Sequence, residues 1–272
     1  MTAATRPTSR WPSSRRVPPS TMLGIAGLAA FAVVLEVLPR LLQLPSNVLP
    51  PLSSILSALA GELRTVAFWQ AVQDTVVQWA LGLSIAVAAG ASVGVLIGSV
   101  PVLRRATAST IEFLRPIPSV ALVPLAVLLF GTQLRSALLL IIYASFWQVL
   151  VQTMYGVVDV DPVADQTARS YGLGRWARVR YVVWPTAMPY LATGVRLAAS
   201  VALILAITAE LVIGSPGLGQ EINAAQSGGA TALAYGLILV TGIFGLVVNV
   251  GVRTLERRVL SWHVSVRGEV TQ

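Results

Sequence analysis

Residues 79–100 read WALGLSIAVAAGASVGVLIGSV and contain no charged side chain. A bilayer core of about 30 Å requires roughly 20 apolar residues in an α-helix, so this run is long enough to cross it. Small residues recur at every fourth position, at Gly82, Ala86, Gly90, Gly94 and Gly98. Positions four apart share one helical face. The spacing therefore predicts a membrane helix, extended backwards from about residue 68, that packs closely against a neighbour.

The composition of the whole chain agrees with a membrane protein. Of its 272 residues, 55% are hydrophobic and 11% are charged, and the mean hydropathy is +0.76. A soluble domain carries about 25% charged residues, so disordered, collagenous and ordinary cytosolic classes are excluded. We predict an all-α, polytopic membrane protein with six transmembrane helices, at about residues 22–38, 79–100, 111–130, 138–158, 188–213 and 232–252.

Two of these spans leave alternatives open. Pro116, Pro118 and Pro124 interrupt the third span, and each ring removes a backbone donor that other groups must replace. The first span could be a cleaved signal peptide. However, Leu38, Pro39 and Arg40 offer no small-residue cleavage site, so we expect an uncleaved helix.

The arginines predict the orientation. All nineteen basic residues are Arg. With the N-terminus inside, Arg40, Arg64 and Arg135 fall outside, Arg196 falls within the fifth span, and the remaining fifteen are cytoplasmic. This positive-inside bias places both termini in the cytoplasm and accounts for the net charge of +8 without nucleic acid. The domains expected are a disordered tail at 1–20, one transmembrane domain at 21–260 and a cytoplasmic tail at 261–272.

Missing residue types exclude several chemistries. The chain has no Cys and one His, His263, so we predict no disulfide, no metal site and no catalytic cluster. It also has no Lys, which excludes a Walker A phosphate loop and Schiff-base catalysis. We therefore expect no enzyme activity and no cofactor bound by this chain.

The 159–187 loop, between the fourth and fifth spans, predicts a short capped helix. Asp161 suits the position before the helix and Pro162 suits its first turn, where the missing N–H costs nothing. The helix should run over 163–171 and end at Gly172, which can adopt the left-handed conformation. The outer segments predict one further short helix at 53–63 and a Gly-, Ser- and Ala-rich loop at 214–230.

A second, basic amphipathic helix is expected at 175–183, before Pro185. Two uses remain open from the residues alone. The helical loop could be gripped by a soluble partner. Alternatively, it could lie on anionic lipid, with Arg175, Arg178 and Arg180 facing phosphates.

Polar residues within the spans also have two interpretations each. Ser145, Gln148 and Gln152 share one face of the fourth span and either bind neighbouring helices or line a translocation pathway. Glu210 either contacts the outer mouth of that pathway or accepts a structural hydrogen bond from the 214–219 turn. Arg196 either snorkels to the inner headgroups or takes part in solute passage.

The loop resembles a known family. Residues 166–185 read QTARSYGLGRWARVRYVVWP, which resembles the Glu-Ala-Ala-x-x-x-Gly-x9-Ile-x-Leu-Pro signature of bacterial ABC importer permeases. The interval from Gly172 to Pro185 matches residue for residue. The main departures are Gln166 for Glu, Thr167 for Ala and Trp184 for Leu. In that family the loop docks on an ATPase subunit, so the resemblance implies a coupling loop carrying Asp161, Asp165, Gln166, Thr167, Ala168, Gly172, Arg175 and Pro185, with Asp165 substituting for the missing Glu.

Three other stretches are similar to the nitrate, sulfonate and taurine branch of this binding-protein-dependent transport family. They are LPSNVLP at 44–50, EFLRPIP at 112–118 and AELVIGSPGLG at 209–219. The resemblance implies the type I importer permease architecture in the bacterial inner membrane. It also implies partners: P-loop ATPase subunits that hold ATP and Mg, an external solute-binding protein, and a second copy or a related permease. The alternative is a self-contained secondary transporter or channel, which predicts mid-membrane ion ligands and repeat symmetry.

Overall fold

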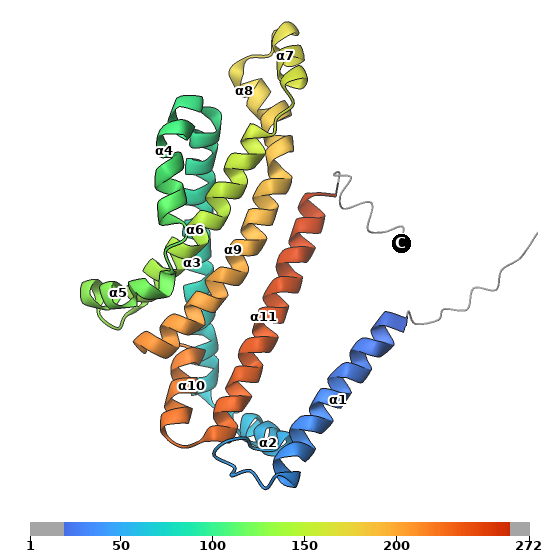
Figure 1. The fold of residues 1–272 in the computed structure, drawn as a ribbon, viewed down its shortest axis with the longest axis vertical. Coiled ribbons are helices and arrows are strands. Elements are labelled where there is room, and N and C mark those ends of the chain that lie inside the picture. Colours follow the sequence, from blue (N-terminus) through green and yellow to red (C-terminus); the bar gives the residue numbers. More distant parts are fainter. Residues whose placement is uncertain (1–18, 262–272) are drawn as a thin grey trace, which may run out of the picture.

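The computed structural model describes residues 19–261, and within them the chain is helical with short connections (Figure 1). The tails expected at 1–20 and 261–272, except for residues 19, 20 and 261, lie outside the described residues, as does His263. The long helices are α1 (Pro19–Leu41), α3 (Val66–Ser99), α6 (Leu134–Val158), α9 (Trp184–Ile213) and α11 (Thr231–Val259). By length and composition five described helices can cross a membrane, or six if one bent pair counts as a span.

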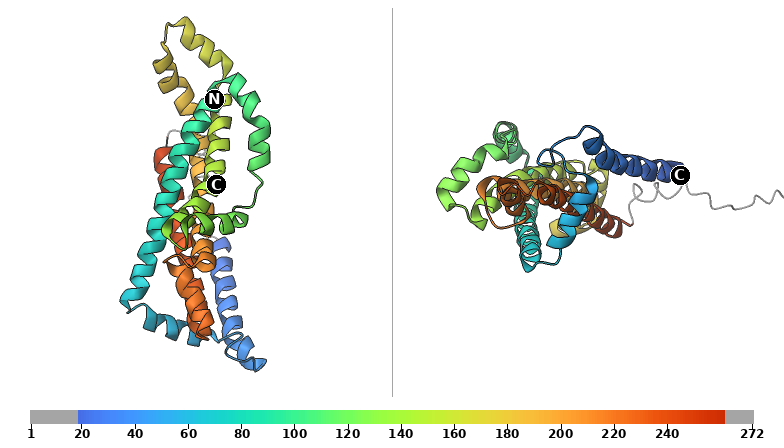
Figure 2. Two further views of the ribbon diagram at one scale, coloured as in Figure 1. Left: turned by 90° about the vertical axis from the view of Figure 1, so that its left-hand side faces the viewer. Right: turned by 90° about the horizontal axis from the view of Figure 1, so that it is seen from below.

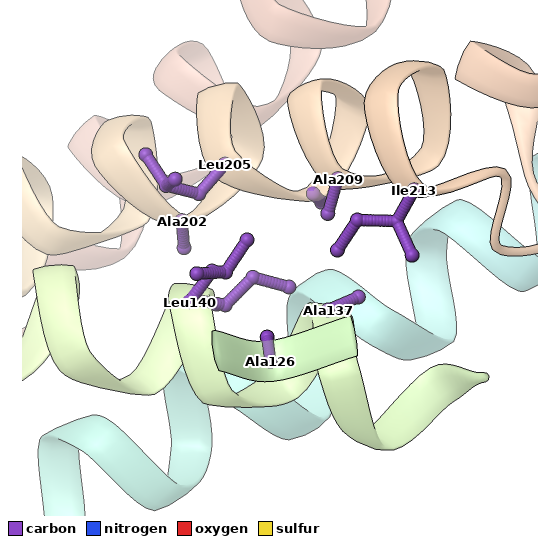
Figure 3. Close-up of a cluster of buried hydrophobic side chains, with 9 residues drawn as sticks. Ala126, Ala137, Leu140, Ala202, Leu205, Ala209 and Ile213 are labelled. Carbon is purple, nitrogen blue, oxygen red and sulfur yellow. The ribbon is translucent and has the colours of Figure 1, made fainter. Parts of the chain in front are cut away.

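Helices α3, α6 and α9 form the centre of the bundle. An ideal Cβ at Gly94 would lie 2.8 Å from the Leu150 carbonyl oxygen, and one at Gly90 would lie 2.9 Å from Val149 Cβ. Only glycine permits α3 and α6 to approach this closely, so the packing predicted from the four-residue spacing is confirmed. A second contact joins α6 and α9 to α5 (Val123–Phe130) through Ala126, Ala137, Leu140, Ala202, Leu205, Ala209 and Ile213 (Figure 3).

The third expected span is not one straight helix over 111–130. The chain instead forms α4 (Pro101–Leu114), a short 3₁₀ turn and α5, with a bend of 81° between them. Pro116 and Pro118 prevent a continuous helix because they lack the required donors. The structure compensates part of the loss, because the Tyr143 hydroxyl donates at 2.7 Å to the Leu114 carbonyl, four residues before Pro118. At the far end of α5, the Ser136 hydroxyl donates to the Gly131 carbonyl at 2.6 Å.

Helix α1 stands to one side of the bundle (Figure 2) and contacts it through α2 (Leu52–Glu62), the short helix expected at 53–63. The Ser53 backbone N–H donates to Glu36 Oε2 at 2.9 Å, and this bond ties the two helices together. Most of the α1 side chains are exposed in the isolated chain, including Leu28 and Phe31. Such a surface suits lipid.

The two ends of the bundle carry different short helices (Figure 1). At one end lie α7 (Pro162–Ser170) and α8 (Arg175–Arg178), and the C-terminal end of α11 and the N-terminal end of α1 point the same way. At the other end lies α10 (Leu218–Ser227), where a loop was expected. The Gly-rich composition was misleading, because Leu218 and Ile222 recur at helical spacing and are buried against α3 and α11.

Candidate coupling loop and buried polar groups

Helix α7 is capped at both ends by the residues that the sequence indicates. The Asp161 carboxylate accepts the Val163 backbone N–H at 2.8 Å. At the other end Gly172 has φ +74°, its N–H donates to the Arg169 carbonyl, and the next N–H, that of Leu173, donates to the Ala168 carbonyl. This pair of bonds is the Schellman arrangement that ends a helix. A helix of nine residues is marginal alone, so the two caps define its length.

The Asp165 carboxylate lies inside the loop, between two arginines. Arg169, one turn further along α7, donates to Asp165 Oδ2 at 2.9 Å. Arg178 of α8 donates through Nε at 2.8 Å and Nη2 at 2.6 Å to Oδ1. The hydrogen bonds from Arg178, supported by those from Arg169, hold the pKa of Asp165 below its usual range. The Asp165 oxygens thus serve the loop itself, and the expectation that Asp165 replaces the missing Glu as a partner contact stays a prediction.

The remaining loop residues divide into exposed and structural positions. Gln166, Thr167 and Arg175 are exposed, whereas Ala168 is the buried residue of α7. Pro185 is the second residue of α9 and follows the π-helical turn at 179–183. Helix α8, a π-helical turn at 179–183 and α9 form one continuous helix, Arg175–Ile213.

Two aromatic side chains on the loop were not among the expected site residues. Trp176 is 86% exposed and Tyr171 is 81% exposed, and Val163 on the same loop is 68% exposed. Tyr, Trp and Arg are the residues enriched at protein interfaces. The signal was present in the sequence as aromatics within a charged loop, but exposure could not be read from it. Beneath the loop, a cleft of about 590 Å³ runs between α3 and α7 and is lined in part by Ser99, Arg175 and Arg178.

The polar face of α6 meets α9. Ser145 is fully buried, and its hydroxyl donates to the Ala198 carbonyl at 3.3 Å. Gln148 and Gln152 are half-buried, and an ideal Cβ at Gly194 would lie 3.0 Å from Gln152 Cβ. This placement favours helix packing for Ser145 over a pathway role. Arg196 of α9 lies beside Glu256 of α11, with 3.3 Å between Nη1 and Oε2.

Glu210 is fully buried at the end of α9 that faces α10. Its Oε2 accepts the Thr75 hydroxyl at 3.0 Å and the Gly219 backbone N–H at 2.9 Å. The second bond is the one expected from the 214–219 turn. Gly217, at φ +150°, must be glycine because a Cβ there would overlap the Glu210 carboxylate. The side chain therefore fastens the turn onto α9.

Gln78 and Ser215 extend this group, since the Ser215 hydroxyl lies 3.5 Å from Gln78 Oε1. We name the four residues Thr75, Gln78, Glu210 and Ser215 the Glu210 cluster. The Gln78 amide donates to the Pro216 carbonyl at 2.5 Å, and the Thr75 hydroxyl accepts the Leu218 N–H at 2.9 Å. All four side chains are at most 2% exposed. Thr75 and Gln78 were not predicted as partners of Glu210. The only signal in the sequence was that both are polar and lie next to an apolar run.

Comparisons with known proteins place the chain in a family. Residues 82–261 match the model described as binding-protein-dependent transport system inner membrane component. The chain is 32% identical to the taurine transport system permease protein TauC of Escherichia coli, over 95% of this chain and 94% of that protein. It is 28% identical to a putative aliphatic sulfonates transport permease protein, SsuC of Bacillus subtilis, over 91% and 90%.

Solved structures agree on the fold. One structure of the MetNI methionine ABC transporter in an inward-facing conformation gives a TM-score of 0.60 at 19% identity, over 71% of this chain and 96% of that one. A structure of an amino acid ABC transporter also gives 0.60, at 21% identity, over 74% and 97%. The chain therefore belongs to the binding-protein-dependent transport system inner membrane components and is a permease subunit of an ABC importer.

Proposed function

We propose that the coupling loop, residues 159–187, is the surface through which a separate ATPase subunit drives this permease. The observation that carries the proposal is a doubly capped helix, α7, at the far end of the bundle (Figure 1), followed in the chain by the exposed Tyr171 and Trp176. An aromatic pair of this exposure gives a partner a large apolar anchor. ATP and Mg would bind on the partner, since this chain has no Lys for a phosphate loop.

The proposed contact between the coupling loop and the ATPase also implies how the permease is oriented in the membrane. If α7 contacts a cytoplasmic ATPase, the α10 end faces outward and would receive solute from an external binding protein. The arginine distribution supports this orientation, because most arginines lie toward the α7 side. The membrane would be the bacterial inner membrane, and the pore would be completed by a second copy or a related permease.

The proposed solute is a small molecule of the taurine, sulfonate or nitrate kind. Support comes from relatives whose names specify taurine and aliphatic sulfonates, together with a nitrate import permease of Leptolyngbya laminosa that is 27% identical over 71% of this chain. Within the described residues, α9 carries one arginine, Arg196, and it is paired with Glu256. We therefore assign solute selection mainly to the external binding protein.

The alternative of a self-contained transporter or channel has less support. Residues 19–261 contain no group of three or more acidic or His side chains that could hold a metal ion. The buried Glu210 is engaged by Thr75 and Gly219. The matched relatives are permease proteins of transport systems.

The test is co-purification followed by reconstitution. The permease is expressed with a candidate P-loop ATPase subunit from the same organism, and complex recovery and solute-stimulated ATP hydrolysis are measured. We expect Tyr171→Ala with Trp176→Ala to lower complex recovery about tenfold or more, as for interface anchors. Trp69→Ala is the matched control, because Trp69 is also exposed but lies at the opposite end of the bundle, near α2. Equal recovery from both variants, or transport by the permease alone, would refute the proposal.

A further inference from the structure

Helix α7 is attached to the bundle by two short linkers, so something else must fix its angle. Linker 159–161 leads from α6, and linker 171–174 leads to α8. The second linker contains Gly172 and Gly174, and an ideal Cβ at either would meet nothing within 4 Å. Such a linker is open and adaptable. The Tyr190 hydroxyl of α9 donates to Asp159 Oδ2 at 2.6 Å and anchors the first linker, so rotation of α7 relative to α9 would occur at the second linker unless a further contact opposed it.

The bridge from Asp165 to Arg178 is the contact that opposes this rotation. Within residues 19–261 it is the one ion pair that links α7 to a different helix. Both side chains are only about a fifth exposed, at 22% and 23%. Two nitrogens of the guanidinium meet one carboxylate oxygen, which restricts rotation more than a single contact does.

Arg178 lies at one end of a helix that runs through the whole bundle. It is the last residue of α8 and so belongs to the continuous helix Arg175–Ile213. The opposite end of that helix carries Glu210, which is fastened to α10. A displacement of α7 that reaches Arg178 is therefore applied to a helix that runs the length of the bundle (Figure 1).

We infer that Asp165 is a positioning residue whose bridge to Arg178 fixes the angle between α7 and the continuous helix Arg175–Ile213. Movement imposed on α7 is then passed to α9 and is not absorbed by the 171–174 linker. The inference rests on the proposed function, since it assumes that an ATPase moves α7. It assigns Asp165 a role within the loop and leaves contact with the partner to the exposed side chains.

Arg169 supplies an internal control. It also binds Asp165, at 2.9 Å, but it lies on α7 itself and is 63% exposed. Removing it takes one cation from Asp165 without breaking the link between helices. Arg178→Gln and Arg169→Gln are therefore the same chemical change at two positions, and only the first releases α7.

The first measurement needs no ATPase. Because the chain has no Cys, Thr167→Cys and Val179→Cys can carry spin labels on α7 and on the π-helical turn. In the purified permease we expect one narrow distance distribution, unchanged by Arg169→Gln and broadened by Arg178→Gln or Asp165→Ala. A distribution that stays narrow in Arg178→Gln overturns the inference, whatever the identity of the partner.

The second measurement uses the complex with the ATPase in proteoliposomes. We expect Arg178→Gln to lower the ratio of solute-stimulated to basal ATP hydrolysis about tenfold, because charged hydrogen bonds are the strong ones. Arg169→Gln should change the ratio less than about twofold. Complex recovery should be the same for both, since neither changes Tyr171 or Trp176. Equal ratios for the two variants overturn the inference. Failure of the wild-type chain to bind the ATPase would refute the proposed function, and the spin-label result would still decide whether the bridge fixes α7.

Discussion

The coupling loop and the Glu210 cluster hold the two ends of α9 by different means. In the loop, Asp165 is paired with Arg169 and Arg178 at a partly exposed surface. In the cluster, Glu210 is fully buried and accepts hydrogen bonds from the Thr75 hydroxyl and the Gly219 backbone N–H. One end is built from opposite charges that water can reach, and the other from hydrogen bonds that it cannot.

The difference separates a bridge that sets the angle of one short helix from bonds that hold the fold together. Ion pairs that water can reach are screened, so the bridge contributes little to overall stability. A buried acceptor that loses its donors costs about 1–3 kcal/mol. We therefore expect changes in the Glu210 cluster to lower stability, and changes in the loop to alter coupling while the protein remains folded.

The largest effect is expected at Gly219. A Cβ there would lie 2.5 Å from the Ile207 carbonyl oxygen, which belongs to the backbone and cannot move aside. Gly219→Ala should lower stability by about 2 kcal/mol or more, measured as the melting temperature in detergent. Gly61→Ala is the control, because a Cβ at Gly61 meets nothing within 4 Å, and it should be neutral or slightly stabilising. Equal melting temperatures for the two variants would contradict the claim that the α10 end of α9, unlike the coupling loop, contributes to stability.

Glu210→Ala should have the next largest effect. It removes the acceptor of two hydrogen bonds and leaves the Gly219 N–H buried without a partner, at a cost of about 2 kcal/mol. Glu210→Gln keeps an accepting oxygen and should recover more than half of the loss. Thermal melting should rank wild type above Glu210→Gln and Glu210→Gln above Glu210→Ala. A Glu210→Ala variant as stable as wild type would show that the cluster does not hold α10.

Gly172→Val in the coupling loop should have the opposite pattern: coupling is lost while the protein remains folded. The left-handed φ of +74° costs a β-branched residue about 1–2 kcal/mol locally, but the site is open, so the bundle should still fold. We expect normal amounts in the membrane and no solute-stimulated ATP hydrolysis. Full stimulation in this variant would contradict the coupling role of the loop.

Cysteine accessibility sharpens the description of the polar face of α6. Ser145→Cys should resist a small aqueous thiol reagent both with and without ATP and vanadate, because position 145 is fully buried against α9. Gln148→Cys and Gln152→Cys are half-buried and decide whether this face lines a pathway. If they react, and the rate changes on trapping, the pathway interpretation holds. Uniform protection, with Thr167→Cys as the reactive control, assigns the whole face to helix packing.

The smallest effect concerns pH. The hydrogen bonds from Arg178 and Arg169 lower the pKa of Asp165 from its ordinary 3.8. A lowered carboxyl pKa gives stabilisation that is present above the ordinary value and is lost as the pH falls through the lower one. The distance distribution between labels at 167 and 179 should therefore be the same from pH 8 to about 5. Broadening within that range would show that the bridge is weaker than its geometry indicates.

Features set by neighbouring residues could be predicted from the sequence. Asp161, Pro162 and Gly172 define α7 because capping depends on a few adjacent positions. The glycine spacing from 82 to 98 predicted close packing because a helix repeats every 3.6 residues. These rules need no knowledge of the rest of the chain.

Features that depend on distant residues could not be predicted. Nothing in one sequence pairs Thr75 with Glu210, which lie 135 positions apart. Pro116 and Pro118 indicated an interruption but not a bend of 81°, since the angle depends on packing against α6. The pairing of Asp165 with Arg178 could not be predicted either, because the two side chains meet only when α7 folds back on α8.

Site-specific cross-linking tests most directly whether the coupling loop is the surface that meets the ATPase. A photoreactive residue is placed at position 176 in one variant and at position 69 in another, replacing exposed tryptophans at opposite ends of the bundle. In membranes that contain the complete transporter, we predict that the probe at position 176 forms an adduct with the ATPase subunit and the probe at position 69 does not. An adduct from position 69, or none from position 176, would contradict the account.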